Sequence, residues 1–339
     1  MSTENAIAKA LQTGVPFVSD PWGALGEPLG LSGDAVLAQV RAFVEGGQLR
    51  EISGVLEGSA LGWDSALVAA RVAPERLDAV ATIVNACPTV THDYVRDHAY
   101  NLWFTIAMPA EIGVDAALAA LSRETGVSPL QALRRTATFK IGVRFDLETM
   151  ENASQKGAIA APPRRSLDAR EKSMLRALQQ PLPIEHFPFA TLAYENGLRE
   201  EELLSYARGA LGGVLRRYVA TFRHRKLGVH GNGMVVWRID EASLPEIGAM
   251  FAEAPEVSHC YARNPIEGFP YSLYTMIHAK DEATVRAVAA SMAARVGDPE
   301  HAILFSTREL KKTRLRYFQP ELEVWWALMA AGRATEAAE

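Results

Sequence analysis

Apolar residues recur at helical spacing three times near the start of the chain. This spacing predicts short helices over residues 6–11, 21–29 and 34–44. Ser32 stands where the third helix needs an N-cap, and Gly46 follows its last apolar turn. Residues 49–56 are then predicted to form a β-strand. Three helices followed by a β wing are typical of a winged helix-turn-helix domain, which we assign to residues 1–58.

The pattern after residue 58 alternates between strands and helices. We expect them in this order: strand 65–73, helix 75–86, strands 88–98 and 100–108, helix 113–125, strand 136–147. This βαββαβ order predicts a ferredoxin-like domain, whose helices cover one face of the sheet and leave the other face free.

The second half of the chain repeats the first. The segment from Ala10 to Pro16 recurs from Ala177 to Pro183, and the segment from Pro88 to Tyr94 recurs from Pro255 to Tyr261, about 167 residues later. So long a period indicates a domain duplication, in effect a fused symmetric dimer. The predicted fold class is therefore α+β, a tandem duplication of a winged helix-turn-helix followed by a ferredoxin-like domain. The predicted boundaries are 1–58 and 59–148 for the first copy, 149–166 for a linker, 167–226 and 227–331 for the second copy, and 332–339 for a tail.

Composition narrows the class of protein. A hydrophobic content of 48% with 22% charged residues is ordinary for a globular protein, and no apolar run approaches 18 residues. We therefore expect a cytoplasmic protein without a membrane partner. Cys87 and Cys260 fall at non-equivalent positions of the repeat, so buried thiols are expected and a metal site is not.

The charges argue against binding to DNA, although the layout favours it. A recognition helix normally carries several Lys or Arg residues to approach the phosphate backbone. Here residues 32–46 hold two acidic residues and one Arg, and residues 198–209 hold three consecutive Glu and two Arg. Each helix is net negative, as is the whole chain at −5, so we expect no nucleic-acid partner.

One strand of each copy concentrates reactive side chains. Because strands alternate faces with period two, His92, Tyr94, Arg96 and His98 are expected to share a face. The repeat places three such residues on the corresponding face, namely His259, Tyr261 and Arg263. A single strand histidine is usually structural, but a face of this composition is costly to bury without a ligand.

Further cations follow the same pattern. Lys140 and Arg144 alternate with apolar residues in the last strand of the first copy, and Lys312, Arg314 and Arg316 are expected to share a face in the second. A solvated sheet face is the alternative explanation. Taken together, these residues suit a flat ligand with many carboxylates, whose ring Trp103 and Tyr274 could line.

The run His92-Asp-Tyr-Val-Arg-Asp-His-Ala-Tyr-Asn-Leu-Trp-Phe-Thr105 resembles the signature of the sirohaem decarboxylases, as do residues 259–263, 270–278 and 222–226. These enzymes have the fold of leucine-responsive (Lrp/AsnC-type) regulators, and this chain is similar to their fused form of haem d1 synthesis. The resemblance implies loss of CO2 from the C12 and C18 acetates of sirohaem, giving 12,18-didecarboxysirohaem for haem d1 or an alternative route to haem b. It also implies related decarboxylase subunits as partners.

The resemblance and the residue pattern together give the candidate site. Three histidines are the candidate catalytic groups: His92, His98 and His259. Eight residues are the candidate substrate-binding groups: Tyr94, Arg96, Lys140, His224, Arg225, Tyr261, Arg263 and Lys312. No cofactor is expected, because the iron belongs to the sirohaem substrate. The second copy has Asn264 and Pro265 after Arg263 and no equivalent of His98, so two equal sites are not expected.

Two other functions remain open from the sequence. A tetrapyrrole-sensing regulator of the Lrp/AsnC type would bind both the ligand and operator DNA. A tetrapyrrole carrier would bind sirohaem without releasing CO2.

Overall fold

The computed structural model describes residues 2–145, 152–156, 163–222 and 231–332. The first helix-turn-helix contains α1 (Thr3–Thr13), α2 (Pro21–Gly26), the 3-10 turn η1 (Glu27–Leu29) and α3 (Gly33–Glu45), followed by the wing β1 (Leu49–Leu56). The N-cap expected at Ser32 is confirmed, because its hydroxyl accepts from Ala35 N at 3.2 Å. The second copy repeats this order in α6 (Ala169–Leu178), α7 (Pro188–Glu195), α8 (Glu200–Ala210) and β7 (Leu215–Phe222).

Each copy continues into the predicted βαββαβ unit, which confirms the fold class. The first unit contains β2 (Trp63–Ala70), the turn η2 (Pro74–Arg76), α4 (Leu77–Asn85), β3 (Val90–Arg96), β4 (Leu102–Pro109), α5 (Val114–Thr125) and β5 (Gln131–Phe145). The second contains β8 (Gly231–Trp237), α9 (Leu244–Glu253), β9 (Val257–Arg263), β10 (Leu273–Ala279), α10 (Glu282–Ala294) and β11 (His301–Lys312).

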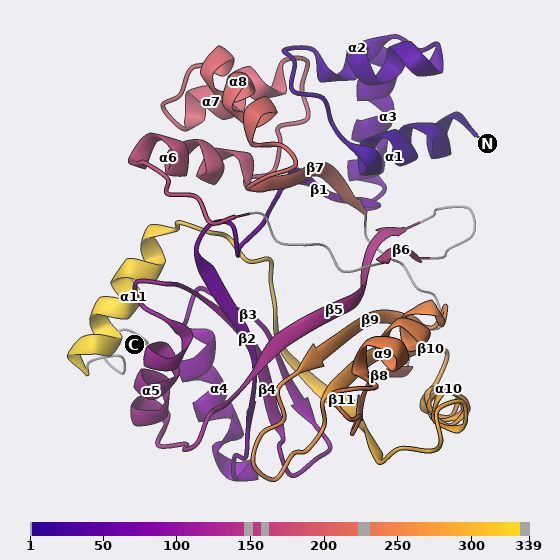
Figure 1. The fold of residues 1–339 in the computed structure, drawn as a ribbon. Coiled ribbons are helices and arrows are strands. Elements are labelled where there is room, and N and C mark those ends of the chain that lie inside the picture. The colour runs from indigo at the N-terminus through magenta and orange to yellow at the C-terminus, as the bar shows by residue number, and fades with distance from the viewer. Residues whose placement is uncertain (1, 146–151, 157–162, 223–230, 333–339) are drawn as a thin grey trace.

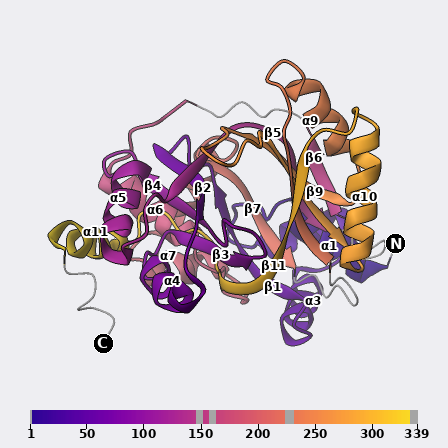
Figure 2. The ribbon, with the colours of Figure 1, turned by 90° about the horizontal axis from the view of Figure 1, so that it is seen from below.

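The two sheets join into one ring of strands. The order is β2-β4-β3-β11-β8-β10-β9-β5, and β5 returns to pair with β2. The long strands β5 and β11 join the two sheets. The first part of β5 pairs with β2 of its own copy and the later part with β9 of the other copy. In the same way, β11 pairs first with β8 of its own copy and then with β3 of the other. Figures 1 and 2 show α4 and α5 on one outer side of this barrel, and α9 and α10 on the opposite side.

The two wings form a separate sheet at one end of the barrel. β1 and β7 pair antiparallel, with Gly54 opposite Tyr218. Figure 1 shows this two-stranded sheet between the helices of the helix-turn-helix pair and the barrel. The helix-turn-helix units also contact each other directly, because Trp22 Nε1 donates to Glu185 O at 2.6 Å and Arg208 Nη1 donates to Phe17 O at 2.7 Å.

The apolar core has three parts. One cluster fills the helix-turn-helix pair and the helix side of the first sheet, and a second fills the helix side of the second sheet. The third lies between the sheets and includes Trp103, Phe269 and Tyr274. Because this third cluster occupies only part of the barrel interior, space remains there for a ligand.

Two expected boundaries need correction. The predicted linker at 149–166 is not wholly irregular, since β6 (Asn152–Lys156) pairs with β5. The helix α11 (Pro320–Ala331), which we assigned to the second ferredoxin-like domain, instead contacts α5 of the first copy and buries Leu322, Trp325 and Met329 in the first cluster. Among the described helices, none has the length and apolar character needed to cross a membrane.

The segment between β11 and α11 ties the barrel to the wing sheet. Arg314 donates from Nη1 to Glu51 Oε1 at 2.5 Å and from Nη2 to Gly54 O at 2.6 Å. Tyr317 N donates to Gln179 Oε1 at 2.7 Å. Arg314, one of the cations that the sequence placed on a sheet face, is therefore a structural residue that joins β1 to the end of the barrel.

The packing at Gly54 yields a stability prediction. A Cβ at Gly54 would lie 2.8 Å from Leu178 O and 2.9 Å from Leu215 Cδ1, so Gly54→Ala must displace β1 from α6 and β7. We expect it to lower the free energy of unfolding by about 1–3 kcal/mol in a denaturant titration. The matched control is Gly209→Ala in α8, where a Cβ would meet nothing within 4 Å. An equal loss in both variants would contradict the packing at Gly54.

Candidate ligand-binding cavity

A cavity of about 430 Å³ lies inside the barrel, between the sheets of the two copies. Side chains from β2, β3, β4 and β5 of the first copy and from β8, β9, β10 and β11 of the second form its wall. The lining residues are Leu67, His92, Tyr94, Arg96, Trp103, Phe104, Thr105, Arg135, Met234, His259, Tyr261, Arg263, Tyr274, Thr275, Met276, His278, Ser306 and Lys312. The face that each sheet leaves free of helices is thus the face that meets a ligand.

Equivalent residues of the two copies face each other across this cavity. The strands β3 and β9 contribute three matched pairs: His92 with His259, Tyr94 with Tyr261, and Arg96 with Arg263. Each arginine reaches across a joint of the ring, Arg96 Nη1 to Leu304 O at 2.9 Å and Arg263 Nη1 to Leu133 O at 2.8 Å. The Nε of both arginines is buried and lacks a hydrogen-bond partner among the described residues, so each guanidinium has an unsatisfied donor.

A neighbouring hydroxyl orients each of the paired histidines. Thr91 Oγ1 lies 3.1 Å from His92 Nδ1, and Ser258 Oγ lies 2.9 Å from His259 Nδ1. Ser258 also donates to Met276 O at 3.3 Å, which leaves its oxygen to accept from a protonated Nδ1 of His259. Nε2 is therefore the ring nitrogen of His259 that is left for a ligand.

The environment disfavours a charged imidazole at both positions. Burial lowers the pKa of His259 to about 4, and the positive charge of Lys140, together with that of His92 when His92 is protonated, adds to this effect. Burial and Lys312 lower the pKa of His92 as well, while Glu309 acts in the opposite direction. Both histidines are consequently neutral at pH 7 in the empty cavity.

The cavity wall is strongly cationic. It holds Arg96, Arg135, Arg263 and Lys312 together with three histidines, and none of its described lining residues is Asp or Glu. Burial lowers the pKa of Arg263 to about 10, which leaves it charged at neutral pH. The chain as a whole has a net charge of −5, but this wall carries positive charge, which favours an anionic ligand.

Aromatic residues form the apolar part of the wall. Trp103 and Tyr274, which the sequence proposed as ring-lining residues, both border the cavity. Trp103 Nε1 donates to Tyr100 O at 2.7 Å, which fixes the indole in place. The guanidinium of Arg263 lies 5.5 Å from the Tyr261 ring centre and 5.6 Å from that of Tyr274. A flat, partly apolar anion suits this combination.

The structure separates the predicted site residues into three groups. Seven of them line the cavity: His92, Tyr94, Arg96, His259, Tyr261, Arg263 and Lys312. Two lie elsewhere. His98 follows the end of β3, where its Nδ1 accepts from Tyr100 N at 3.0 Å, and buried Lys140 donates to Ala254 O at 2.8 Å. The last two, His224 and Arg225, lie outside the described residues.

The prediction that His98 shares a strand face with His92, Tyr94 and Arg96 is therefore wrong, because β3 ends at Arg96 and the chain turns before His98. Lys140 is displaced for a similar reason. A register shift between Thr138 and Lys140 turns its side chain away from the cavity and towards α9. Bulges of this kind change the face of every following residue and leave no signal in the alternation pattern.

The sequence-based candidate site leaves out five polar residues of the wall: Thr105, Arg135, Thr275, His278 and Ser306. Arg135 was missed because the strand was expected to begin at residue 136, whereas β5 begins at Gln131. His278 continues the alternation of Tyr274 and Met276 along β10, and this signal was available in the sequence.

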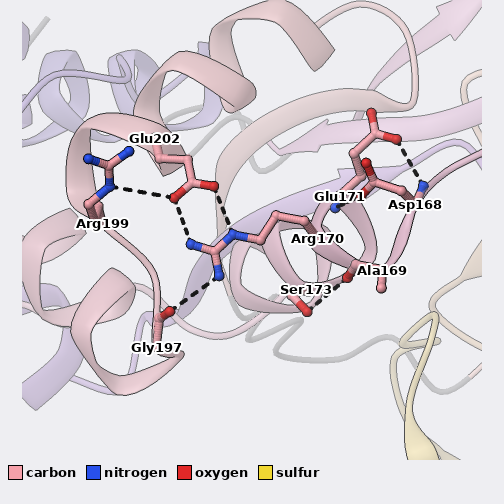
Figure 3. Close-up of polar contacts among 8 residues, drawn as sticks. All are labelled: Asp168, Ala169, Arg170, Glu171, Ser173, Gly197, Arg199 and Glu202. Atoms are coloured by element: carbon pink, nitrogen blue, oxygen red, sulfur yellow. Dashed lines mark hydrogen bonds and ion pairs between the residues drawn. The ribbon is translucent and has the colours of Figure 1, made fainter.

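The first turns of α3 and α8, the third helix of each helix-turn-helix, carry acidic side chains. In the second copy Arg170 of α6 binds Glu202 of α8 through two nitrogens, at 2.8 and 2.6 Å, as Figure 3 shows. The Nε of Arg199 lies 3.9 Å from the same carboxylate. In the first copy Asp34, at the start of α3, lies 3.5 Å from His186 of the other helix-turn-helix. The starts of both helices thus carry acidic side chains that are engaged within the protein.

Comparisons with known proteins agree with this geometry. Residues 4–50 match the family model described as siroheme decarboxylase NirDL-like HTH domain, and residues 60–140 and 226–311 match the AsnC-like ligand binding domain. A siroheme decarboxylase of Hydrogenobacter thermophilus is 36% identical over 325 residues, which cover 94% of this chain and 96% of that protein. The chain belongs to the sirohaem decarboxylase family.

Other members of the sirohaem decarboxylase family agree in structure and in length. A crystal structure of the siroheme decarboxylase NirDL in co-complex with an iron-uroporphyrin III analogue has a TM-score of 0.82 and 32% identity, covering 97% of this chain and 98% of that one. The siroheme decarboxylase beta subunit of Desulfovibrio desulfuricans is 37% identical over 150 residues, which cover 44% of this chain and 94% of that protein. A separate subunit of the family thus corresponds to about half of this fused chain.

The lowered pKa of His259 predicts a pH dependence of stability. Between pH 6.5 and about 4 the unfolded chain binds a proton at this residue and the folded protein does not, so stability falls as the pH falls. His259→Gln removes this proton uptake. We therefore expect the variant to lose roughly 2 kcal/mol less unfolding free energy than the wild type between pH 7 and pH 5.

Denaturant titrations at the two pH values test this expectation. Asp93, whose pKa burial raises to about 7, acts in the opposite direction over this range, and its contribution cancels when the two proteins are compared. Equal pH slopes in wild type and variant would contradict the neutral state of His259.

Proposed function

We propose that this chain decarboxylates sirohaem, removing CO2 from the C12 and C18 acetates to give 12,18-didecarboxysirohaem for haem d1 or alternative haem synthesis. The observation that carries the proposal is the cavity wall of four permanent cations, three histidines and five other aromatic residues, without a carboxylate among its described residues. A macrocycle with carboxylates around its edge matches this wall in both charge and shape. The bound tetrapyrrole analogue in a relative of 32% identity supports the same class of ligand.

The chemistry that the cavity must perform is modest. The bond between the acetate methylene and its carboxylate breaks, CO2 leaves, and the electron pair stays on the methylene carbon. The conjugated macrocycle shares this charge, so we propose that the protein needs no cofactor beyond the iron tetrapyrrole that is its substrate. The methylene then takes a proton and becomes a methyl group, which requires a positioned acid.

His92 and His259 are the proposed proton donors. Their Nδ1 atoms are engaged by Thr91 and Ser258, which leaves Nε2 for the substrate. In the empty cavity both imidazoles are neutral, because of burial and the surrounding positive charges. Entry of a polycarboxylate reverses the sign of the local field and raises the pKa of these histidines, so substrate binding itself charges the acids.

The guanidinium groups have a different role in this proposal. Arg96 and Arg263 hold the carboxylates that do not react, because a carboxylate that is well stabilised by arginine resists loss of CO2. The reacting acetate must instead lie against the less polar wall, near a histidine. Lys312, whose Nζ lies 3.8 Å from Glu309, is partly exposed and suits a carboxylate at the edge of the cavity.

The partner proposal follows from the duplication. Both halves that separate subunits supply in related proteins are present in this one chain, so we propose that it acts on sirohaem without a second decarboxylase subunit. We also propose that it does not bind nucleic acid, because α3 and α8 begin with acidic side chains that are engaged within the helix-turn-helix pair.

Anaerobic incubation of the purified protein with sirohaem, followed by product mass, tests the enzyme. We expect loss of two carboxyl groups, and a decrease in rate of at least about 100-fold for His92→Gln or His259→Gln, the contribution typical of a general acid. The control is His186→Gln, an exposed histidine of the helix-turn-helix pair, which should retain full activity. Sirohaem that binds and stays unchanged would identify a carrier and overturn the proposed reaction.

An electrophoretic shift assay with double-stranded DNA at several salt concentrations tests the absence of nucleic-acid binding. We expect no specific complex, because acidic first turns repel the phosphate backbone. A complex that forms with one DNA sequence and weakens steeply with salt would instead favour the tetrapyrrole-sensing regulator.

A further inference from the structure

The cavity has two ends, one beside Arg96 of β3 and the other beside Arg263 of β9, and they are not equivalent. Most lining residues have a counterpart of similar chemistry in the other copy, as His92 has in His259. Lys312 lacks one, because Ile141 stands opposite His259 where Lys312 stands opposite His92. Arg135 lacks one as well. In β5 it pairs with Arg263 of β9, and the matching backbone position in β11, which pairs with Arg96 of β3, is Ser306. One end therefore has two guanidinium groups where the other has a guanidinium and a hydroxyl.

The two guanidinium groups flank the same aromatic ring. The guanidinium carbon of Arg135 lies 5.7 Å from the centre of the Tyr261 ring, and that of Arg263 lies 5.5 Å from it. No Asp or Glu of the described residues lies within ion-pair distance of Arg135, whereas the adjacent Arg134 pairs with Asp115 at 2.8 Å. Two neighbouring cations without an anion are mutually repulsive, and a ligand that brings two carboxylates removes the repulsion.

The opposite end offers less to an anion. The guanidinium of Arg96 lies 5.6 Å from the Tyr94 ring centre, and Ser306 Oγ has no hydrogen-bond partner among the described residues. Lys312, the other cation on this side, pairs with His92, four residues from Arg96 along β3, and its Nζ lies 3.8 Å from Glu309. Beside Arg96 itself, one guanidinium group and a neutral donor suit one carboxylate better than two.

We propose that the pair Arg135 and Arg263 binds two neighbouring carboxylates of the tetrapyrrole and so fixes which way round the macrocycle lies. This inference rests on the proposed function and adds the order in which the two acetates lose CO2. The C12 and C18 acetates are on different pyrrole rings, so a fixed orientation presents one of them to the histidines first. The intermediate that has lost one CO2 is then a single isomer.

An exchange of the two residues tests the orientation. Wild type, Arg135→Ser, Ser306→Arg and the double variant are each incubated with sirohaem, quenched before completion, and the two isomers of the singly decarboxylated product are separated and assigned by NMR. We expect one isomer to dominate in the wild type and a mixture in Arg135→Ser, with sirohaem binding weakened about tenfold. The double variant, in which the paired cations move to the other end, should favour the opposite isomer.

Arg134→Ser is the matched control, because it removes an adjacent arginine that already has a carboxylate partner. It should leave both the isomer ratio and sirohaem binding unchanged. Arg135→Gln keeps the length of the side chain and replaces Arg135→Ser if thermal unfolding shows that the serine variant is misfolded.

Two results would overturn the inference while leaving the proposed function intact. They are equal amounts of both isomers in the wild type, and a wild-type ratio that persists when Arg135 is replaced. A wild type that releases no CO2 is a different failure, visible before any isomer is assigned, and it would overturn the proposed function together with the order that rests on it.

Discussion

The backbone pairing between the two copies is the constraint on which the cavity depends. β3 pairs with β11 and β5 with β9, so each sheet is completed by a strand of the other copy. This pairing closes the ring and turns the helix-free faces towards each other, which creates an interior that neither copy has alone. The hydrogen bonds of Arg96 to Leu304 and of Arg263 to Leu133 cross the same joints, so the ligand-facing guanidinium groups are held by the closure itself.

The winged helix-turn-helix pair supports the end of the barrel and contributes charges that act on residues of the cavity. Its wings pair with each other, Arg314 anchors β1 to the segment after β11, and charges on the wing sheet reach the cavity residues. The positive charge of Arg50 on β1 contributes to the lowered pKa of His92, and Arg216 on β7 acts on Tyr261. A domain that reads DNA in other proteins is thus part of the electrostatic surroundings of a ligand site.

The sequence predicts the duplication, the element order and most of the cavity because all three depend on local pattern. Helical spacing, strand alternation and the repeated His-x-Tyr-x-Arg motif can all be detected in one amino-acid sequence without knowledge of which distant residues pair. The failures at His98 and Lys140 arise where β3 ends and where β5 shifts register, events decided by cross-strand pairing with distant residues. Arg135 was missed for a related reason, since the start of β5 is fixed by its pairing with β2.

Fusion of the copies explains why the two ends of the cavity can differ. In a symmetric homodimer any substitution appears twice, so an arginine gained at one end is gained at the other. In the fused chain each position changes alone. The residues behind the paired histidines have also diverged: Asp93 and Cys260 are both fully buried, yet only Asp93 is a carboxylate, held by Asn85 at 2.9 Å. The tetrapyrrole is itself unsymmetrical around its edge. A cavity whose charges differ from end to end can therefore hold it in one orientation, whereas a symmetric cavity would accept two orientations with equal affinity.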